Sequence, residues 1–220
     1  MTRFSVGLKS LSPLLQNRMS EEALLNLRDK TKKKSKVAAK PSLEDEAASK
    51  IHVDAEGRPC IPRKVLMAAL IEGGRFIRLD QKRQLSTKDS SLLPGLLVLE
   101  AESWPLLDPQ SDSGDISKWG LASWRYDLQQ GRNPNGGEAV CCVRPMFEHW
   151  AFFLHCLLDL DELPEDTYLR LFGLTGNRIG LCDFRPACKG TFGQFCVVQW
   201  KRITDDVPLV QPMRDLVMGR

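Results

Sequence analysis

The stretch GNRIGLCDFRPACKGTFGQF, residues 176–195, separates an expected helix from the last expected strand, and the fold assignment depends on it. It holds four glycines, three basic side chains and three phenylalanines. Glycine lets the backbone approach a ligand closely, and basic side chains attract phosphate. The stretch therefore predicts a phosphate-binding loop, a zinc loop built on Cys182 and Cys188, or a turn between two core elements.

Apolar periodicity predicts the core elements around this loop. The expected strands and helices, in chain order, are strand 2–11, helix 62–78, strand 92–103, strand 148–161, helix 163–176 and strand 192–203. The largely apolar run at 92–103 predicts a strand in the centre of a sheet. This order is that of the ferredoxin-like (RRM-like) split β-α-β, an α+β fold in which an antiparallel four-stranded sheet carries two helices on one face.

Two segments interrupt this order and are expected to be insertions in a single domain that spans residues 1–220. The first, at about 20–60, contains the polar, Lys-rich run KTKKKSK. The second, at 116–146, has two extended stretches joined by GRNPNGG, whose Asn and Gly residues suit a tight turn. The second insertion therefore predicts a protruding hairpin.

The composition limits the class of protein. A net charge of +3 means that any basic surface must be local. Seven cysteines without regular spacing are typical of reduced thiols, so we expect a cytoplasmic protein. No apolar segment approaches the roughly 20 residues that span a bilayer, so we expect no membrane partner.

Four segments in this order resemble one known family. They are SPLLQNRM at 12–19, DAEGRPCIPRKVLMAALIEGGR at 54–75, the hairpin before VRPMFEHW at 143–150, and the loop at 176–195. Together they resemble the RAMP superfamily, the RRM-like proteins that form backbone subunits of CRISPR effector complexes, with single-domain relatives in phages and mobile elements. A Gly-rich loop alone occurs in many folds, so the order of the segments carries the resemblance.

The resemblance implies a non-catalytic protein that grips RNA or single-stranded DNA by its backbone, usually a guide RNA. It also implies a helical filament of identical copies, other subunits of a ribonucleoprotein complex as partners, and a role in antiviral defence. In that family the Gly-rich loop and a thumb-like hairpin touch nucleic acid, which here would be residues 173–193 and 116–146.

The loop supplies candidate contacts to nucleic acid. Arg makes bidentate and Lys point-charge contacts to phosphate, glycines bring backbone N–H groups close, and an aromatic ring can stack on a base. The candidates are Arg178, Arg185 and Lys189 for phosphates, Gly176, Gly180, Gly190 and Gly193 for close approach, and Phe184 or Phe192 for stacking. The alternative is that these phenylalanines fill the core and that the glycines are steric necessities.

The two insertions supply further candidates. In the hairpin the phosphate contacts would be Lys118, Arg125 and Arg132, whereas Trp119 and Trp124 suit either base stacking or a subunit contact. The lysines of the first insertion form either a solvated run or a basic arm that folds on nucleic acid. They are Lys30, Lys32, Lys33, Lys34 and Lys36.

The sequence argues less strongly for catalysis, and we expect no cofactor, metal or catalytic residue. Cys182 and Cys188 lack the close pair typical of structural zinc sites. Asp183 is expected to orient the loop through a salt bridge to Arg185, and acidic residues at 159–166 suit a helix N-terminus. Two alternatives remain: a metal-dependent RNA endonuclease of the same superfamily, and a purely structural polymer of a phage or mobile element.

Overall fold

The chain folds into an α+β structure with antiparallel sheets, as the sequence predicts. A computed structural model covers the chain and describes residues 1–19, 24–25, 28, 41–81, 83–109, 119–132 and 137–203, except for the side chain of Arg132. Within those ranges, no helix is both long and apolar enough to span a bilayer.

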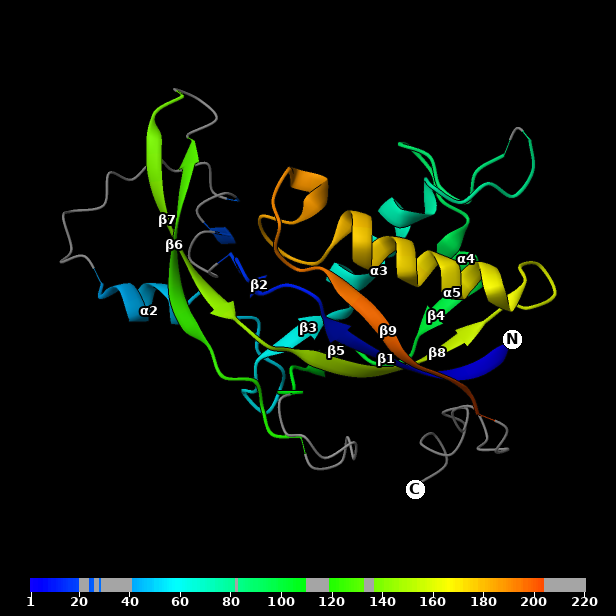
Figure 1. The fold of residues 1–220 in the computed structure, drawn as a ribbon, viewed down its shortest axis with the longest axis horizontal. Coiled ribbons are helices and arrows are strands. Elements are labelled where there is room, and N and C mark those ends of the chain that lie inside the picture. Colours follow the sequence, from blue (N-terminus) through cyan, green and yellow to red (C-terminus); the bar gives the residue numbers. More distant parts are fainter. Residues whose placement is uncertain are drawn as a thin grey trace, which may run out of the picture.

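The largest sheet has four strands in the order β4-β8-β1-β9, and every neighbouring pair is antiparallel. Its strands are β1 (Thr2–Ser10), β4 (Leu97–Leu99), β8 (Ala151–Leu158) and β9 (Phe195–Arg202). Helices α3 (Arg63–Gly74) and α5 (Glu165–Leu174) lie together over one face of this sheet (Figure 1). The first strand is therefore central, between two strands from the second half of the chain.

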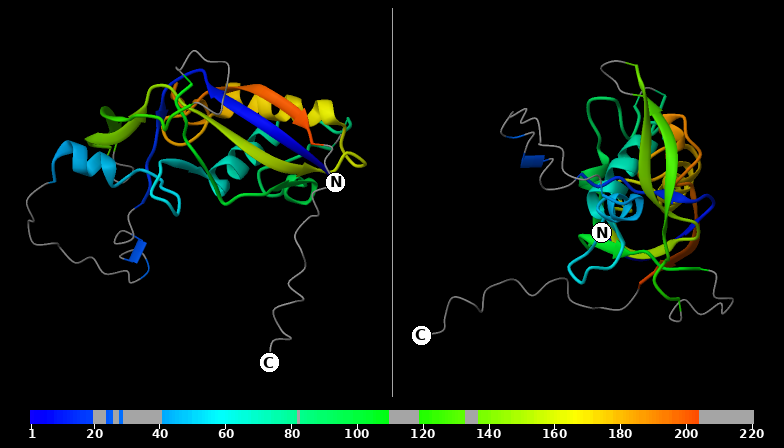
Figure 2. Two further views of the ribbon diagram at one scale, coloured as in Figure 1. Left: turned by 90° about the horizontal axis from the view of Figure 1, so that it is seen from below. Right: turned by 90° about the vertical axis from the view of Figure 1, so that its left-hand side faces the viewer.

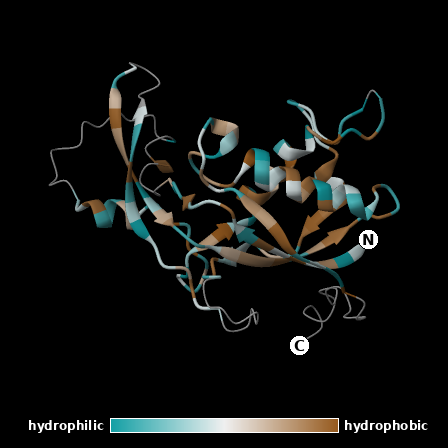
Figure 3. Ribbon diagram, viewed as in Figure 1, coloured by the Kyte–Doolittle hydropathy of each residue, from teal (hydrophilic) through white to brown (hydrophobic). Residues whose placement is uncertain are grey.

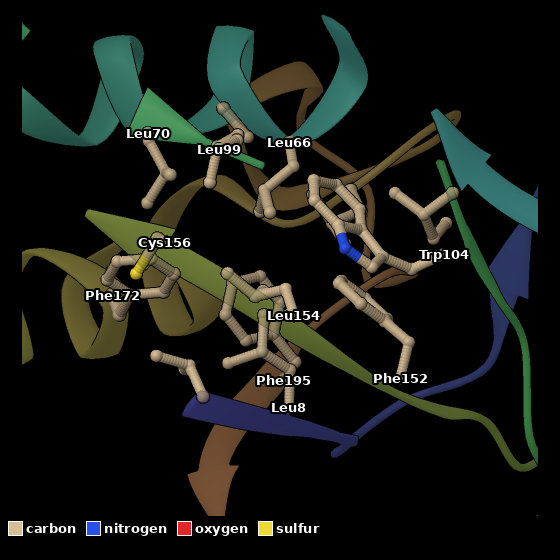
Figure 4. Close-up of a cluster of buried hydrophobic side chains, with 14 of the residues drawn as sticks. Leu8, Leu66, Leu70, Leu99, Trp104, Phe152, Leu154, Cys156, Phe172 and Phe195 are labelled. Atoms are coloured by element: carbon tan, nitrogen blue, oxygen red, sulfur yellow. The ribbon is translucent and has the colours of Figure 1, made fainter. Parts of the chain in front are cut away.

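Alternation along the strands builds the core under the helices. Phe4, Val6 and Leu8 of β1 are fully buried, and the residues between them point to the other face. Leucines of α3 meet Leu8 and the apolar face of β8 from above (Figure 4). Burying one such side chain contributes about 1.5–3 kcal/mol, so this layer dominates the stability of the fold.

The two helices begin as their sequences predict. Pro62 and Pro164 directly precede α3 and α5, where their fixed φ suits the start of a helix. Glu165 and Asp166 lie in the first turn of α5 and are stabilised by the helix dipole. In contrast, the first turn of α3 is basic and has no acidic residue.

The prediction of a central strand at 92–103 is wrong. Residues Leu93–Leu96 form a short helix, α4, and only Leu97–Leu99 form β4, which lies at the edge of the sheet. Pro94 explains the difference, because its φ suits the first turn of a helix and it has no N–H for a strand ladder. Further along, β5 (Ser103–Pro105) pairs with β3 (Cys60–Pro62) in a small sheet that the sequence did not predict.

The second insertion forms a hairpin, as predicted. Its strands β6 (Arg125–Arg132) and β7 (Ala139–Phe147) pair over their length, and β2 (Leu14–Leu15) extends the base of β7. The hairpin and α2 (Leu43–Ala48) lie together at one end of the molecule (Figure 2). Hydrophilic and hydrophobic positions mix along the hairpin, whereas β4, β8 and β9 are mostly hydrophobic (Figure 3).

A π-helical turn, η2 (Thr175–Ile179), continues α5 and passes directly against β9. Gly176 is buried at this crossing, where an added Cβ would clash with the backbone carbonyl of Phe195. Gly173 in α5 has open space around it. The two neighbouring glycines therefore differ in what they contribute to the fold.

We expect Gly176→Ala to lower the free energy of unfolding by about 1–3 kcal/mol, because the clash forces the backbone apart. Gly173→Ala is the matched control and should raise the unfolding free energy by about 0.5–1 kcal/mol through its helix propensity. Urea unfolding of both variants measures the difference. Equal effects of the two substitutions would contradict the packing of η2 on β9.

Candidate nucleic-acid interface

Residues 173–179 of the predicted loop belong to α5 and η2, so the Gly-rich loop of the structure is residues 180–194, a compact segment held by its own backbone hydrogen bonds. The N–H of Leu181 donates to the carbonyl of Gly193 at 2.9 Å, and the N–H of Phe192 donates to that of Phe184 at 3.1 Å. The N–H of Gly193 also donates to the Pro13 carbonyl at 2.7 Å, which ties the loop to the segment after β1. The loop is thus positioned by the first strand of the sheet.

The loop stores backbone strain. Cys182, Phe184 and Lys189 adopt left-handed conformations with φ of 62°, 49° and 65°. Such conformations cost on the order of 1–3 kcal/mol for a residue with a side chain, and they persist where the surrounding structure enforces them. Strained residues of this kind cluster at ligand-binding sites. The strain therefore marks this loop as a candidate site on grounds independent of its charge.

The loop glycines have packing roles. Gly180 has a φ of 73°, and Gly190 lies so close to the carbonyl of Phe184 that a Cβ would clash with it. Phe184 itself is only half-buried. These constraints agree with glycines as steric necessities, while close approach to phosphate and stacking by Phe184 stay predictions.

A pocket of about 400 Å³, here called the loop pocket, lies between the Gly-rich loop, α3 and the segment after β2. This volume falls within the range of pockets that hold small ligands. It is lined by Asn17, His52, Lys64, Val65, Ala68, Ala69, Gly180, Cys182, Asp183 and Arg185. The pocket therefore joins two of the predicted residues, Gly180 and Arg185, to residues far away in the sequence.

Among the described residues, unpaired cations lie at the loop pocket and beside it: Lys64 lines the pocket, as does the carboxylate of Asp183, and Arg18 follows the lining residue Asn17 in the chain. Lys64 and Arg18 are exposed, and in the part of the chain that the structure describes neither has an ion-pair partner. Burial and, to a smaller extent, the nearby charges of Lys64 and Arg18 together lower the pKa of His52 from 6.5 to about 4. His52 is therefore neutral at pH 7 and can hydrogen-bond to a ligand without adding charge.

Two ion pairs hold the loop against its neighbours. Arg185 binds Glu72 of α3 at 3.0 Å and also donates to the carbonyl of Cys182 at 3.2 Å. Asp183 pairs at 2.8 Å with Arg144 of the hairpin strand β7. Asp183 does form a salt bridge that holds the loop, as expected, but its partner is Arg144 and not the nearby Arg185. The two ion pairs link the loop to the hairpin and to α3.

The other two predicted basic residues, Lys189 and Arg178, do not line the loop pocket. Lys189 is exposed and follows the short helix η3 (Pro186–Cys188). Arg178, in η2, is exposed, and its Cζ atom lies 5.3 Å from the ring centroid of Phe76. The structure therefore distributes Arg178, Arg185 and Lys189 over three places.

The hairpin candidates are only partly described. Arg125 is exposed and lies 3.7 Å from Glu148, a pair of low energetic value in water. Lys118, the side chain of Arg132 and the lysines between positions 30 and 36 lie outside the described residues. Trp119 packs against Phe153 with 5.7 Å between ring centroids, and Trp124 packs on the core. Both tryptophans thus contact the body of the molecule.

Sequence reasoning missed four residues around the site: Arg18, His52, Lys64 and Phe76. One signal was available, because Arg63 and Lys64 place two cations in the first turn of α3, where the helix dipole disfavours them. Arg63 pairs with Glu102, whereas Lys64 is left facing the pocket. An unpaired cation at an unfavourable position indicates a role other than stability.

No cluster of three His, Cys, Asp or Glu side chains within the described ranges could hold a metal ion. Burial raises the pKa of Cys182 to about 12, so its thiol is protonated at neutral pH and is a poor metal ligand. Cys188 is exposed on η3. Neither cysteine therefore belongs to such a cluster among the residues that the structure describes.

Comparison with protein-family models finds no match to the chain, and none of the curated proteins matches it. Among solved structures, one similar chain belongs to "Cryo-EM structure of the Type III-B Cmr-beta bound to cognate target RNA", with a TM-score of 0.43 and 11% identity. The match covers 92% of this chain and 60% of the other. A likeness of this degree leaves the function to be argued from the chain's own residues.

We expect His52 to make stability depend on pH. Its pKa is about 6.5 in the unfolded chain and about 4 in the folded one, so the unfolded state binds more protons between these values. The free energy of unfolding should fall as the pH drops from ~6.5 to ~4, and by pH ~5 His52 should account for about 1–2 kcal/mol. Urea unfolding of wild type and His52→Gln across this range measures the difference. A His52 NMR resonance that titrates near pH ~6.5 would contradict the burial.

Proposed function

We propose that the chain is a RAMP-like protein that holds single-stranded RNA or DNA by its sugar-phosphate backbone at the loop pocket. The strand order β4-β8-β1-β9, with α3 and α5 on one face, supports a ferredoxin-like domain as its basis. The hairpin β6-β7 supports the role of the thumb-like element that the RAMP resemblance implies. No catalytic residue is part of the proposal.

The observation that carries the proposal is the charge at the loop pocket. Lys64 and Arg18 have no anionic partner among the described residues, so their charge is available to a ligand. Two unit charges 4 Å apart interact by about 4 kcal/mol near a protein surface, so an unpaired cation here attracts a phosphate that stays partly hydrated. Arg185 adds a guanidinium at the same pocket, shared with Glu72.

The structure around the pocket suits a polymer better than a small anion. The Arg144–Asp183 pair joins the hairpin to the loop, so a strand that leaves the pocket meets the hairpin. Contacts to successive phosphates need no particular base, which agrees with cations spread over several elements. We therefore propose that Arg178, Lys189, Lys118, Arg125 and Arg132 contact phosphates outside the pocket.

The hairpin also supports self-association along the strand. Tyr126 and Leu128 are 45% and 49% exposed and share one face of β6, an unusual pair of apolar side chains for a solvated hairpin. We propose that they pack against the next copy in a helical homo-oligomer. Other subunits of a ribonucleoprotein complex remain proposed partners.

Two alternatives are separated from this proposal by direct tests. A metal-dependent RNA endonuclease requires acidic or histidine ligands that face the bound strand. A structural polymer requires assembly without nucleic acid. Cleavage of a labelled RNA with magnesium, or filaments in material free of nucleic acid, would favour these alternatives.

We expect Lys64→Gln to weaken binding of a fluorescein-labelled oligoadenylate and to flatten its salt dependence. Each lost phosphate contact reduces the slope of log K against log salt by about 0.7 for a single strand. Fluorescence anisotropy at several salt concentrations measures both effects. Lys201→Gln is the matched control, because Lys201 is exposed on β9 and points away from the helices.

Two results would contradict the assignment of the phosphate contacts to the loop pocket. An unchanged salt slope in Lys64→Gln and Arg185→Gln, with wild-type binding intact, would move the interface away from the loop pocket. A loss in Lys201→Gln equal to that in Lys64→Gln would show a diffuse charge effect.

We expect the number of bound copies to rise stepwise with the length of the oligoadenylate, because each copy covers a segment of a few nucleotides. Native mass spectrometry counts the copies, and a denaturing gel run with magnesium checks that the RNA stays intact. Leu128→Ser should reduce stepwise binding without changing the salt slope of a single copy. One copy per strand at every length would contradict self-assembly.

A further inference from the structure

We propose that Phe76 and Arg178 form a stacking platform for an unpaired nucleobase, about one helical turn beyond Glu72, the ion-pair partner of the pocket residue Arg185. This proposal rests on the proposed function and extends it from backbone binding to base contact. The occupant is a base of the strand whose phosphates lie at Lys64 and Arg185. Duplexes are excluded from this contact because their bases are stacked on each other.

Phe76 is the only exposed phenylalanine of the nine in the chain, all of which the structure describes. Its side chain is 45% exposed, although an aromatic ring of this size is normally buried. The Cζ atom of Arg178 lies 5.3 Å from the ring centroid. The ring of Phe76 therefore lies on the surface, where the guanidinium of Arg178 lies over it.

The platform is adjacent to the loop pocket. Phe76 follows Glu72 by four residues, and the N–H of Phe76 donates to the carbonyl of Gly73 at 3.0 Å, so the chain is still turning as a helix there. Four residues of helix rise about 6 Å. Because Glu72 binds Arg185, the platform lies about one turn beyond the ion-pair partner of a pocket residue, on the far side of Ala69, the last α3 residue that lines the pocket.

The chemistry of the pair suits a base. An aromatic ring stacks on any base because every base has a π face, and a planar guanidinium stacks in the same way. Arg75 and Arg78 are exposed beside Phe76 and add positive charge for the neighbouring phosphates. The contact is therefore tolerant of sequence but requires the base to be unpaired.

The other phenylalanines that are not fully buried are less exposed than Phe76. Phe184 and Phe192 are half-buried in the loop, and Phe153 packs against Trp119 on the opposite side of the sheet. Phe184 also has a φ of 49°, so its side-chain direction is set by the loop. The structure therefore moves the expected stacking residue from the loop to the end of α3.

The test compares two probes with the same phosphates: a fluorescein-labelled oligoadenylate and an abasic oligoribonucleotide of equal length. We expect the wild-type protein to prefer the oligoadenylate by about 5- to 150-fold, the range that corresponds to one stacked base. Phe76→Leu should abolish this preference and keep the salt slope. Phe76→Tyr should retain the preference, because the aromatic face is preserved.

Arg178→Gln is the second variant, and it should reduce both the preference and the salt slope. Equal binding of the two probes by wild type, or an unchanged preference in Phe76→Leu, would overturn the platform while the pocket remains intact. Failure of the proposed function looks different, because wild type would then bind neither probe in a salt-dependent way. Phe76 is exposed, so urea unfolding should show that Phe76→Leu folds like the wild type.

Discussion

The pairing of β1 with both β8 and β9 is the constraint on which the rest of the structure depends. The first ten residues of the chain form the centre of the sheet, so the N-terminal strand needs partners from positions beyond 150. The segment directly after β1 then carries the carbonyls of Pro13 and Leu15, which hold Gly193 and Asp183 of the Gly-rich loop. The register of one strand thus positions both the core and the loop pocket.

The two cations at the start of α3 lower the stability of this helix and lie beside the loop pocket. The first turn of this helix holds Arg63 and Lys64, although the positive end of the helix dipole disfavours cations there. Arg63 is neutralised by Glu102, and Lys64 is not. His52 responds to the same field, since its lowered pKa reflects burial beside Lys64 and Arg18. A phosphate at the proposed site would offset the positive charge at this end of α3.

Ion pairs around the loop set how far the site can rearrange. Arg185 is shared between Glu72 and the pocket, and the pair is about a third exposed, so exchange of the carboxylate for a phosphate requires little desolvation. Asp183 joins the loop to the hairpin through Arg144, whose side chain is more buried. The left-handed residues at 182, 184 and 189 fix the loop backbone between these two anchors. The Arg185–Glu72 pair on the α3 side of the pocket can therefore rearrange more easily than the Asp183–Arg144 pair on the hairpin side.

Periodicity and turn residues were sufficient to predict the α+β class, the elements β1, α3, β8, α5 and β9, and the hairpin at 125–147. These features are local, because alternation, helix-starting prolines and Asn-Gly turns act within a few residues. The edge position of β4 was missed, since Pro94 turned half of an apolar run into a helix. Ion-pair partners were also missed: Asp183 was assigned to its neighbour in sequence and binds Arg144 instead.

The sequence by itself determined which residues are apolar, basic or conformationally free. Only the tertiary structure decided that Lys64 and Arg185 share the pocket and that Phe76 is exposed beside Arg178. Each of these pairs is separated by more than a hundred positions and depends on how α3 packs against η2 and the loop.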